Sequence, residues 1–93
     1  MKAESSVKVE DGKLVKAKIE YGNSIRDVEI RGDFFLEPPE ALKQIQKKIK
    51  GLPTDTSQKE IAELLEDVEA DFIGFSRESV AEAVTQAVEG GEE

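Results

Sequence analysis

The chain offers few side chains that could perform catalysis. Its 93 residues include no histidine and no cysteine, which removes the usual base near neutral pH, the strongest nucleophile and most metal ligands. Carboxylates remain, but Glu63, Glu66 and Asp67 fall on the polar side of a helical pattern. Nothing in the sequence indicates the burial that tunes a catalytic acid. The glycines between the first strands are isolated and form no phosphate-binding loop. We therefore predict no active site within this chain.

Two short motifs imitate known binding sites. Asp67, Glu69 and Asp71, with Glu78 at the twelfth place, have the spacing of a calcium loop. The sixth place of such a loop needs a glycine for its sharp turn, and here it holds Phe72. Burial of Phe72 in the core explains that residue better, so we predict no metal site. The second motif, Arg31-Gly32-Asp33, matches extracellular adhesion tripeptides, and its place at a predicted strand end favours a chance occurrence.

The charge of the chain is unevenly distributed. Residues 1–50 carry 11 basic and 9 acidic side chains, whereas residues 51–93 carry 2 basic and 12 acidic ones, for a net charge of −8. We do not expect nucleic acid as a partner, because phosphate neutralisation needs a clustered basic surface. No apolar run is long enough to cross a membrane, and no N-terminal leader is recognisable. We expect a cytoplasmic protein, whose acidic half keeps it in solution or meets a basic face on another protein.

The first third of the chain has the pattern of antiparallel strands. Apolar residues alternate with polar ones over 5–10, 13–21 and 24–34, with turn signals at Asp11-Gly12 and Gly22-Asn23. Ile25 is out of phase with Val28, which predicts a bulge or a twist near Arg26-Asp27. The inward side chains we expect are Val7, Val9, Val15, Ala17, Ile19, Tyr21, Val28, Ile30, Gly32 and Phe34. These segments predict a three-stranded meander with one solvent-facing side.

The remainder of the chain has helical spacing. A first helix led by Pro38-Pro39 should end before Gly51, and a Ser57–Glu60 capping box should start a second. A short extended piece over 71–75 brings Phe72 and Ile73 to the core and would add a short extra strand. Ser76 then caps a third helix that ends at Gly90-Gly91. The inward residues we expect are Leu42, Ile45, Ile49, Ile61, Leu64, Leu65, Val68, Val80, Ala83, Val84, Ala87 and Val88. The whole indicates a single α+β domain over residues 1–93, a meander packed against three helices.

Several short motifs, in this order and spacing, resemble one protein family. They are Gly12-Lys13-Leu14-Val15, the run from Ile30 to Phe35, the run from Pro38-Pro39-Glu40-Ala41 to Ile49-Lys50-Gly51-Leu52-Pro53, and Ile73-Gly74-Phe75-Ser76. From about residue 8 to residue 88 the chain resembles the C-terminal accessory domain of lipoate–protein ligases. Since the sequence starts with Met1 just before these motifs, it is similar to the split form of the enzyme, in which a separate small subunit completes the ligase.

The resemblance implies a function that the residues alone do not. Members of this family activate lipoate with ATP to lipoyl-adenylate and transfer it to a lysine of an acceptor, either a lipoyl domain or the glycine-cleavage H protein. It implies that lipoate, ATP and Mg²⁺ are bound by a catalytic subunit, with which this chain forms a heterodimer as a non-catalytic accessory subunit. The alternative is an acidic interaction adaptor with no link to lipoate.

By the resemblance, five residues support the partner or its active site. Lys13 lies at the turn into the second strand, where its charge could reach the partner's active site or simply flank a hairpin. Gly32 would permit a close backbone approach and Asp33 would cap a turn. Alternation cannot bury both Phe34 and Phe35 on one face. One of them therefore enters the core, while the other lies under a helix or is exposed as an anchor for the catalytic chain.

Overall fold

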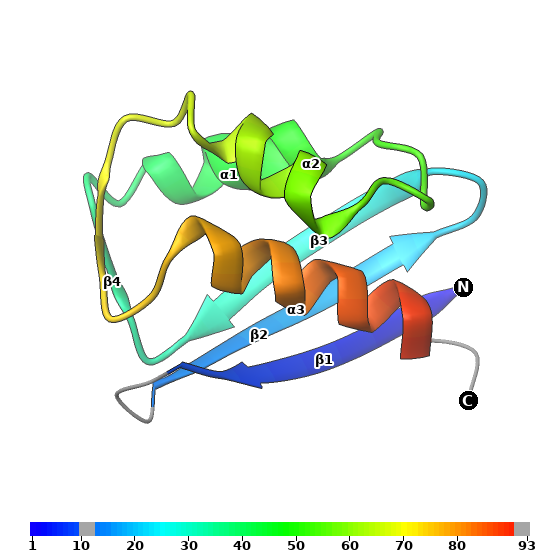
Figure 1. The fold of residues 1–93 in the computed structure, drawn as a ribbon, viewed down its shortest axis with the longest axis horizontal. Coiled ribbons are helices and arrows are strands. Elements are labelled where there is room, and N and C mark those ends of the chain that lie inside the picture. The colour runs from blue at the N-terminus through cyan, green and yellow to red at the C-terminus, as the bar shows by residue number, and fades with distance from the viewer. Residues whose placement is uncertain (10–12, 91–93) are drawn as a thin grey trace.

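The computed structural model describes residues 1–9 and 13–90, which form an antiparallel sheet covered on one face by helices. The sheet has the order β1-β2-β3, and a separate two-stranded ribbon pairs β4 with β5. In chain order the elements are β1 (Lys2–Lys8), β2 (Leu14–Tyr21), β3 (Ile25–Gly32), β4 (Phe35–Glu37), α1 (Ala41–Ile49), α2 (Gln58–Leu65), β5 (Asp71–Ile73) and α3 (Arg77–Gly90) (Figure 1). The predicted α+β meander with three helices is confirmed.

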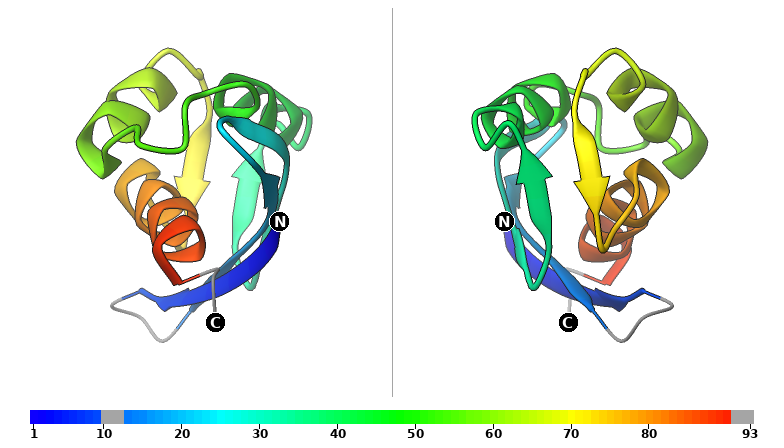
Figure 2. Two further views of the ribbon diagram at one scale, coloured as in Figure 1. Left: turned by 90° about the vertical axis from the view of Figure 1, so that its right-hand side faces the viewer. Right: turned by 90° about the vertical axis from the view of Figure 1, so that its left-hand side faces the viewer.

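The sheet curves around α3, as the two end-on views show (Figure 2). Strict alternation on β2 turns Val15, Ala17, Ile19 and Tyr21 inward, and all four are buried. The inward stripe of α3 meets them with Val80, Ala83, Val84 and Ala87, as predicted. Apolar burial of this kind is the main source of stability in a domain of this size.

The sheet begins earlier than its sequence pattern predicts. β1 starts at Lys2 rather than at residue 5, because the backbone from Lys2 onward pairs with β2. The Met1 ammonium and carbonyl both hydrogen-bond to the backbone of Tyr21 at 2.8 Å. The predicted Asp11-Gly12 turn lies outside the described residues. At the other hairpin, Tyr21 pairs with Ile25 and Glu20 with Asp27, so the predicted bulge at Arg26 is confirmed.

The outer edge of β3 is closed by α1 and the loop that follows it. The Ile30 N–H donates to Gln46 Oε1 at 3.0 Å. The Ile25 N–H donates to the Leu52 carbonyl at 2.8 Å, and the Gly51 N–H donates to the Ile25 carbonyl at 2.7 Å. An uncovered edge strand invites pairing with other chains, and these bonds protect this one.

The helix ends confirm two predictions and correct one. Ser57 and Glu60 form the predicted capping box on α2. Ser76 and Ser79 exchange equivalent bonds at the start of α3, where the Ser79 N–H donates to Ser76 Oγ at 3.1 Å. The prolines, however, do not lead α1: they form the turn before it, and the Ala41 N–H donates to the Pro38 carbonyl. The predicted end of α3 at Gly90-Gly91 falls partly outside the described residues.

Several residues predicted to face inward are more exposed than expected. Val9, Phe34 and Phe72 are half-buried against the core, and Gly32 is exposed. Leu42 and Val88 are half-buried at the margin of the core, with Ala41 buried in place of Leu42. Leu64 is 38% exposed because it lies at the edge of the face that α2 presents to the core. Ile73 is 50% exposed because β5 pairs with β4, which turns this side chain outward.

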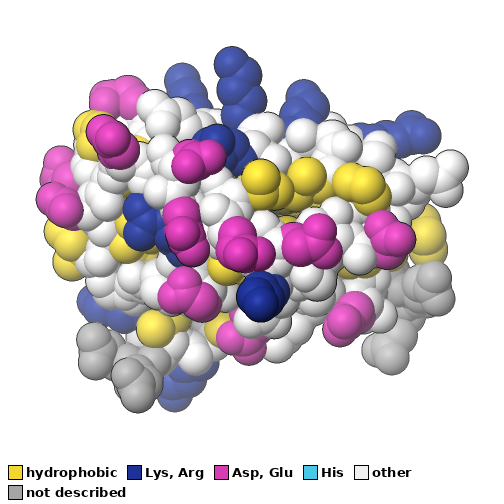
Figure 3. Space-filling view, turned by 45° about the horizontal axis from the view of Figure 1, so that its top comes forward, with side chains coloured by type: hydrophobic (Ala, Val, Ile, Leu, Met, Phe, Trp, Pro, Cys, Tyr) yellow, Lys and Arg dark blue, Asp and Glu magenta, His cyan; other side chains and the backbone are white. Residues whose placement is uncertain are grey.

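Acidic side chains spread over the front of the molecule in Figure 3, with basic side chains among them, and further basic side chains stand along its upper edge. The lysines of α1, Lys43, Lys47 and Lys48, lie outside its buried stripe of Ala41, Ile45 and Ile49. In the part of the chain that the structure describes, no helix is long and apolar enough to cross a membrane.

Candidate functional site

The residues predicted to have a functional role meet at one end of the molecule. Here β2 begins, β3 ends and the β4–β5 ribbon leaves the sheet, at the lower left of Figure 1. Lys13 lies just before β2, and Gly32 is the last residue of β3. The ribbon adds Phe35 opposite Ile73, in a register that continues with Leu36 opposite Phe72. Segments far apart in the sequence therefore form this end of the fold.

Gly32 lets two backbone segments touch. A Cβ at this position would lie 2.0 Å from the Leu14 carbonyl oxygen and 2.8 Å from the Phe34 ring, so no other residue fits without movement of the backbone. The same Leu14 carbonyl accepts a hydrogen bond from the Asp33 N–H at 3.1 Å. The close approach predicted for Gly32 is confirmed.

Asp33 differs from its prediction as a turn cap. Its backbone N–H makes the bond to Leu14, whereas its exposed carboxylate makes no hydrogen bond within residues 1–9 and 13–90. The turn is held by the backbone, which leaves the carboxylate in solvent at the edge of the site.

Phe34 belongs to an aromatic cluster beneath the ribbon. Its ring stacks on that of Phe75, with centroids 3.9 Å apart and planes at 21°. The Phe72 ring also packs on Phe75, with ring centroids 4.8 Å apart and planes at 38°. Phe75 is buried, and Phe34 and Phe72 pack against the core. Of the phenylalanine pair, Phe34 is the one that enters the core.

Arg77 fixes this cluster to the helices, a role that the sequence did not reveal. Its guanidinium lies over the Phe72 ring, 4.4 Å from the centroid, a favourable cation–π geometry. Nε donates to the Leu65 carbonyl at 2.8 Å, and a terminal nitrogen donates to the Val68 carbonyl at 2.6 Å. Leu65 is the last residue of α2, where a cation also suits the helix dipole, and Val68 lies in the turn that follows. An arginine that bridges three elements leaves no local pattern in a sequence.

Phe35 is exposed to solvent. Of the two predicted alternatives, burial under a helix and exposure, the structure has the second. Phe35 is 68% exposed and lies opposite Ile73, which is 50% exposed. The prediction that Ile73 reaches the core was therefore wrong, because the ribbon gives each strand one inward and one outward side. The result is an apolar pair in solvent at the end of the molecule.

Lys13 lies against the turn that follows β5. A Cβ placed on Gly74 would contact the Cγ, Cδ and Cε atoms of Lys13 at 3.5 to 3.7 Å. Gly74 has a φ of +87°, a conformation that favours glycine. The lysine stem thus packs on backbone while the residue stays half-exposed, which lets a charged tip remain in water.

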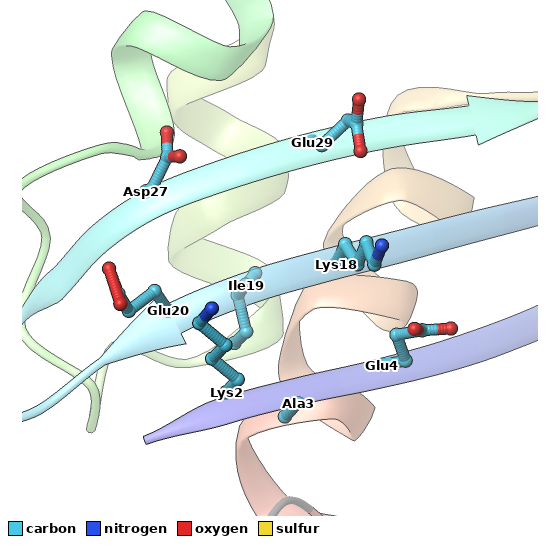
Figure 4. Close-up of a pocket in the computed structure, with 8 residues that line it drawn as sticks. All are labelled: Lys2, Ala3, Glu4, Lys18, Ile19, Glu20, Asp27 and Glu29. Atoms are coloured by element: carbon cyan, nitrogen blue, oxygen red, sulfur yellow. The ribbon is translucent and has the colours of Figure 1, made fainter.

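The outer face of the sheet does not have the character of a binding site for an apolar ligand. An open depression of about 460 Å³ crosses it, with charged side chains that stand away from the helices (Figure 4). Most of these charges alternate across the strands, as in Lys2 opposite Glu20 and Glu4 opposite Lys18. Among the residues that the structure describes, no three acidic side chains are close enough to hold a metal ion.

Comparison with known proteins identifies the family. The family described as "Bacterial lipoate protein ligase C-terminus" matches residues 2–84, from the first strand to the middle of α3. The chain belongs to this family. The match confirms the resemblance carried by the sequence motifs, all of which lie within it.

A solved structure shares the fold of this lipoate protein ligase C-terminal domain. It was reported in a structural analysis of an archaeal lipoylation system, a bi-partite lipoate protein ligase and its E2 lipoyl domain from Thermoplasma acidophilum. The similarity has a TM-score of 0.75 at 21% sequence identity and covers 90% of this chain and 94% of that one. A search of the curated proteins found no match.

The geometry at Gly32 predicts a large effect of adding one methyl group. Gly32→Ala should lower the free energy of unfolding by about 1–3 kcal/mol, because the new Cβ must displace the Leu14 carbonyl. Urea denaturation measures this loss. Gly90→Ala is the matched control, since nothing lies within 4 Å of its Cβ position, and it should change stability by less than about 1 kcal/mol. Equal stability of the two variants would contradict the assignment.

Proposed function

We propose that this chain is the non-catalytic accessory subunit of a two-chain lipoate–protein ligase. In this proposal it joins a catalytic subunit, and both are needed for ATP-dependent activation of lipoate to lipoyl-adenylate. The family match over residues 2–84 carries the proposal. The fold shared with a chain from the study of a bi-partite ligase supports it.

The reaction divides into two steps that make different demands. In the first, the lipoate carboxylate attacks the α-phosphorus of ATP, which forms the mixed anhydride and releases pyrophosphate. In the second, the amine of an acceptor lysine attacks the acyl carbon, which forms an amide and releases AMP. In this proposal the substrates and Mg²⁺ are bound by the catalytic subunit, as the resemblance to the family implies.

An accessory subunit can promote the first step without touching the substrates. If it binds the adenylating conformation of its partner more strongly than the others, it shifts the population towards that conformation. Closure of the complex also excludes water, which would otherwise hydrolyse the reactive anhydride. The rigid end of the fold, with its aromatic cluster and the arginine that fixes it, suits such a role because little order must be gained on binding.

The proposal predicts that only the first step depends on this chain. With lipoate and ATP, the catalytic subunit should modify a lipoyl-domain acceptor only when this chain is present. With preformed lipoyl-adenylate, the catalytic subunit should modify the acceptor with or without it. A mass shift of the acceptor measures both arms. Equal modification from lipoate and ATP without this chain would contradict the proposal and favour an adaptor with no link to lipoate.

Substitutions at Lys13 test whether a positive charge at this end of the fold assists the formation of lipoyl-adenylate. Lys13→Met keeps a stem that can pack on Gly74 but removes the charge, whereas Lys13→Ala removes both. If the charge acts on the partner's active site, both variants should lower formation of lipoyl-adenylate by about tenfold or more. Lys16→Met, on the solvent-facing side of β2, is the control. Full activity of Lys13→Met would reduce Lys13 to a packing role.

A further inference from the structure

The outward side of the β4–β5 ribbon combines apolar and acidic side chains. Strand alternation places Phe35, Glu37, Asp71 and Ile73 on this side, and all four are exposed. We call these four residues the ribbon face. Leu36 and Phe72 lie on the opposite side, against the core. At the left edge of Figure 3, where β4 lies in Figure 1, hydrophobic and acidic surfaces are neighbours.

The ribbon face is rigidly supported. Behind it Leu36 is buried, Phe72 packs on Phe75, and Phe75 stacks on Phe34. The Arg77 guanidinium lies over the Phe72 ring and is itself bonded to two backbone carbonyls. Phe35 is therefore presented on a fixed backbone, and an aromatic anchor held in this way loses little entropy on binding.

The fold itself gains little from this arrangement. Phe35 and Ile73 expose much of their apolar surface to water. Glu37 lies directly opposite Asp71, and like charges in that position destabilise a sheet. Among the residues that the structure describes, neither carboxylate has a basic side chain within 4 Å. Each of these costs would be removed by a partner that covers the apolar pair and supplies basic groups.

We propose that the ribbon face is the surface by which this chain docks on the catalytic subunit, an inference that rests on the proposed function. The partner's surface should have an apolar pocket for Phe35 and Ile73, with lysine or arginine side chains opposite Glu37 and Asp71. A second copy of this chain is a poor occupant, because a symmetric contact would bring four carboxylates together.

Calorimetric titration of the catalytic subunit with this chain tests the docking surface. Phe35→Ala should weaken association by about 30-fold or more, the effect of losing a central aromatic anchor. Leu64→Ala is the matched control, since Leu64 is also exposed but lies on α2, and it should leave the affinity within about twofold. Thermal unfolding of both variants should change little.

Reversing the charge of Glu37 separates a role in docking from a role in folding, because the two roles predict opposite effects on association and stability. Glu37→Lys places an opposite charge across from Asp71, which should maintain or raise the thermal stability of the chain. The same change should weaken association by about tenfold or more at low salt, and by less at high salt. Glu63→Lys makes the same change of charge on α2 and should affect association little.

The outcomes separate the two proposals. Wild-type chain that binds and supports lipoylation, with variants that bind equally well, would overturn the ribbon face and leave the proposed function intact. A wild-type chain that does not bind the catalytic subunit would overturn both. Size-exclusion chromatography adds a third outcome, since a homodimer abolished by Phe35→Ala would assign the ribbon face to a second copy instead.

Discussion

A single backbone contact determines how this end of the molecule is built. The Leu14 carbonyl lies where a side chain on residue 32 would otherwise be, and it binds the next N–H of the chain. Because β3 can end there, the chain leaves the sheet and forms β4. The ribbon, the aromatic cluster beneath it and the exposed pair above it all follow from that departure. The backbone contact with Leu14 therefore requires glycine at position 32, whether or not this residue also contributes to a binding site.

The parts of the fold that depend on neighbouring residues could be predicted from the sequence. Alternation on β2, the bulge at Arg26 and the capping box at Ser57 all follow from local spacing, and the structure has each of them. The parts that depend on distant residues could not. The outward position of Ile73 follows from pairing between segments nearly forty residues apart, and the part played by Arg77 follows from the ends of two helices.

The candidate site shows the same division. Sequence spacing established that Phe34 and Phe35 must point in different directions, and the structure assigns Phe34 to the core and Phe35 to solvent. The acidic pair opposite one another on the ribbon could not be foreseen, because it exists only through the register of β4 and β5. Under the proposed function, the catalytic subunit would cover these exposed residues. Core residues explain the stability of the domain, whereas the exposed apolar and acidic residues of the ribbon do not stabilise it.

The central claim is that adenylate formation by the catalytic subunit requires this chain. Lipoate-dependent exchange of pyrophosphate into ATP measures that step alone, since it needs no acceptor protein. We expect exchange in the mixture of the two subunits and none above background with either subunit alone. Equal exchange by the catalytic subunit with and without this chain would contradict this claim.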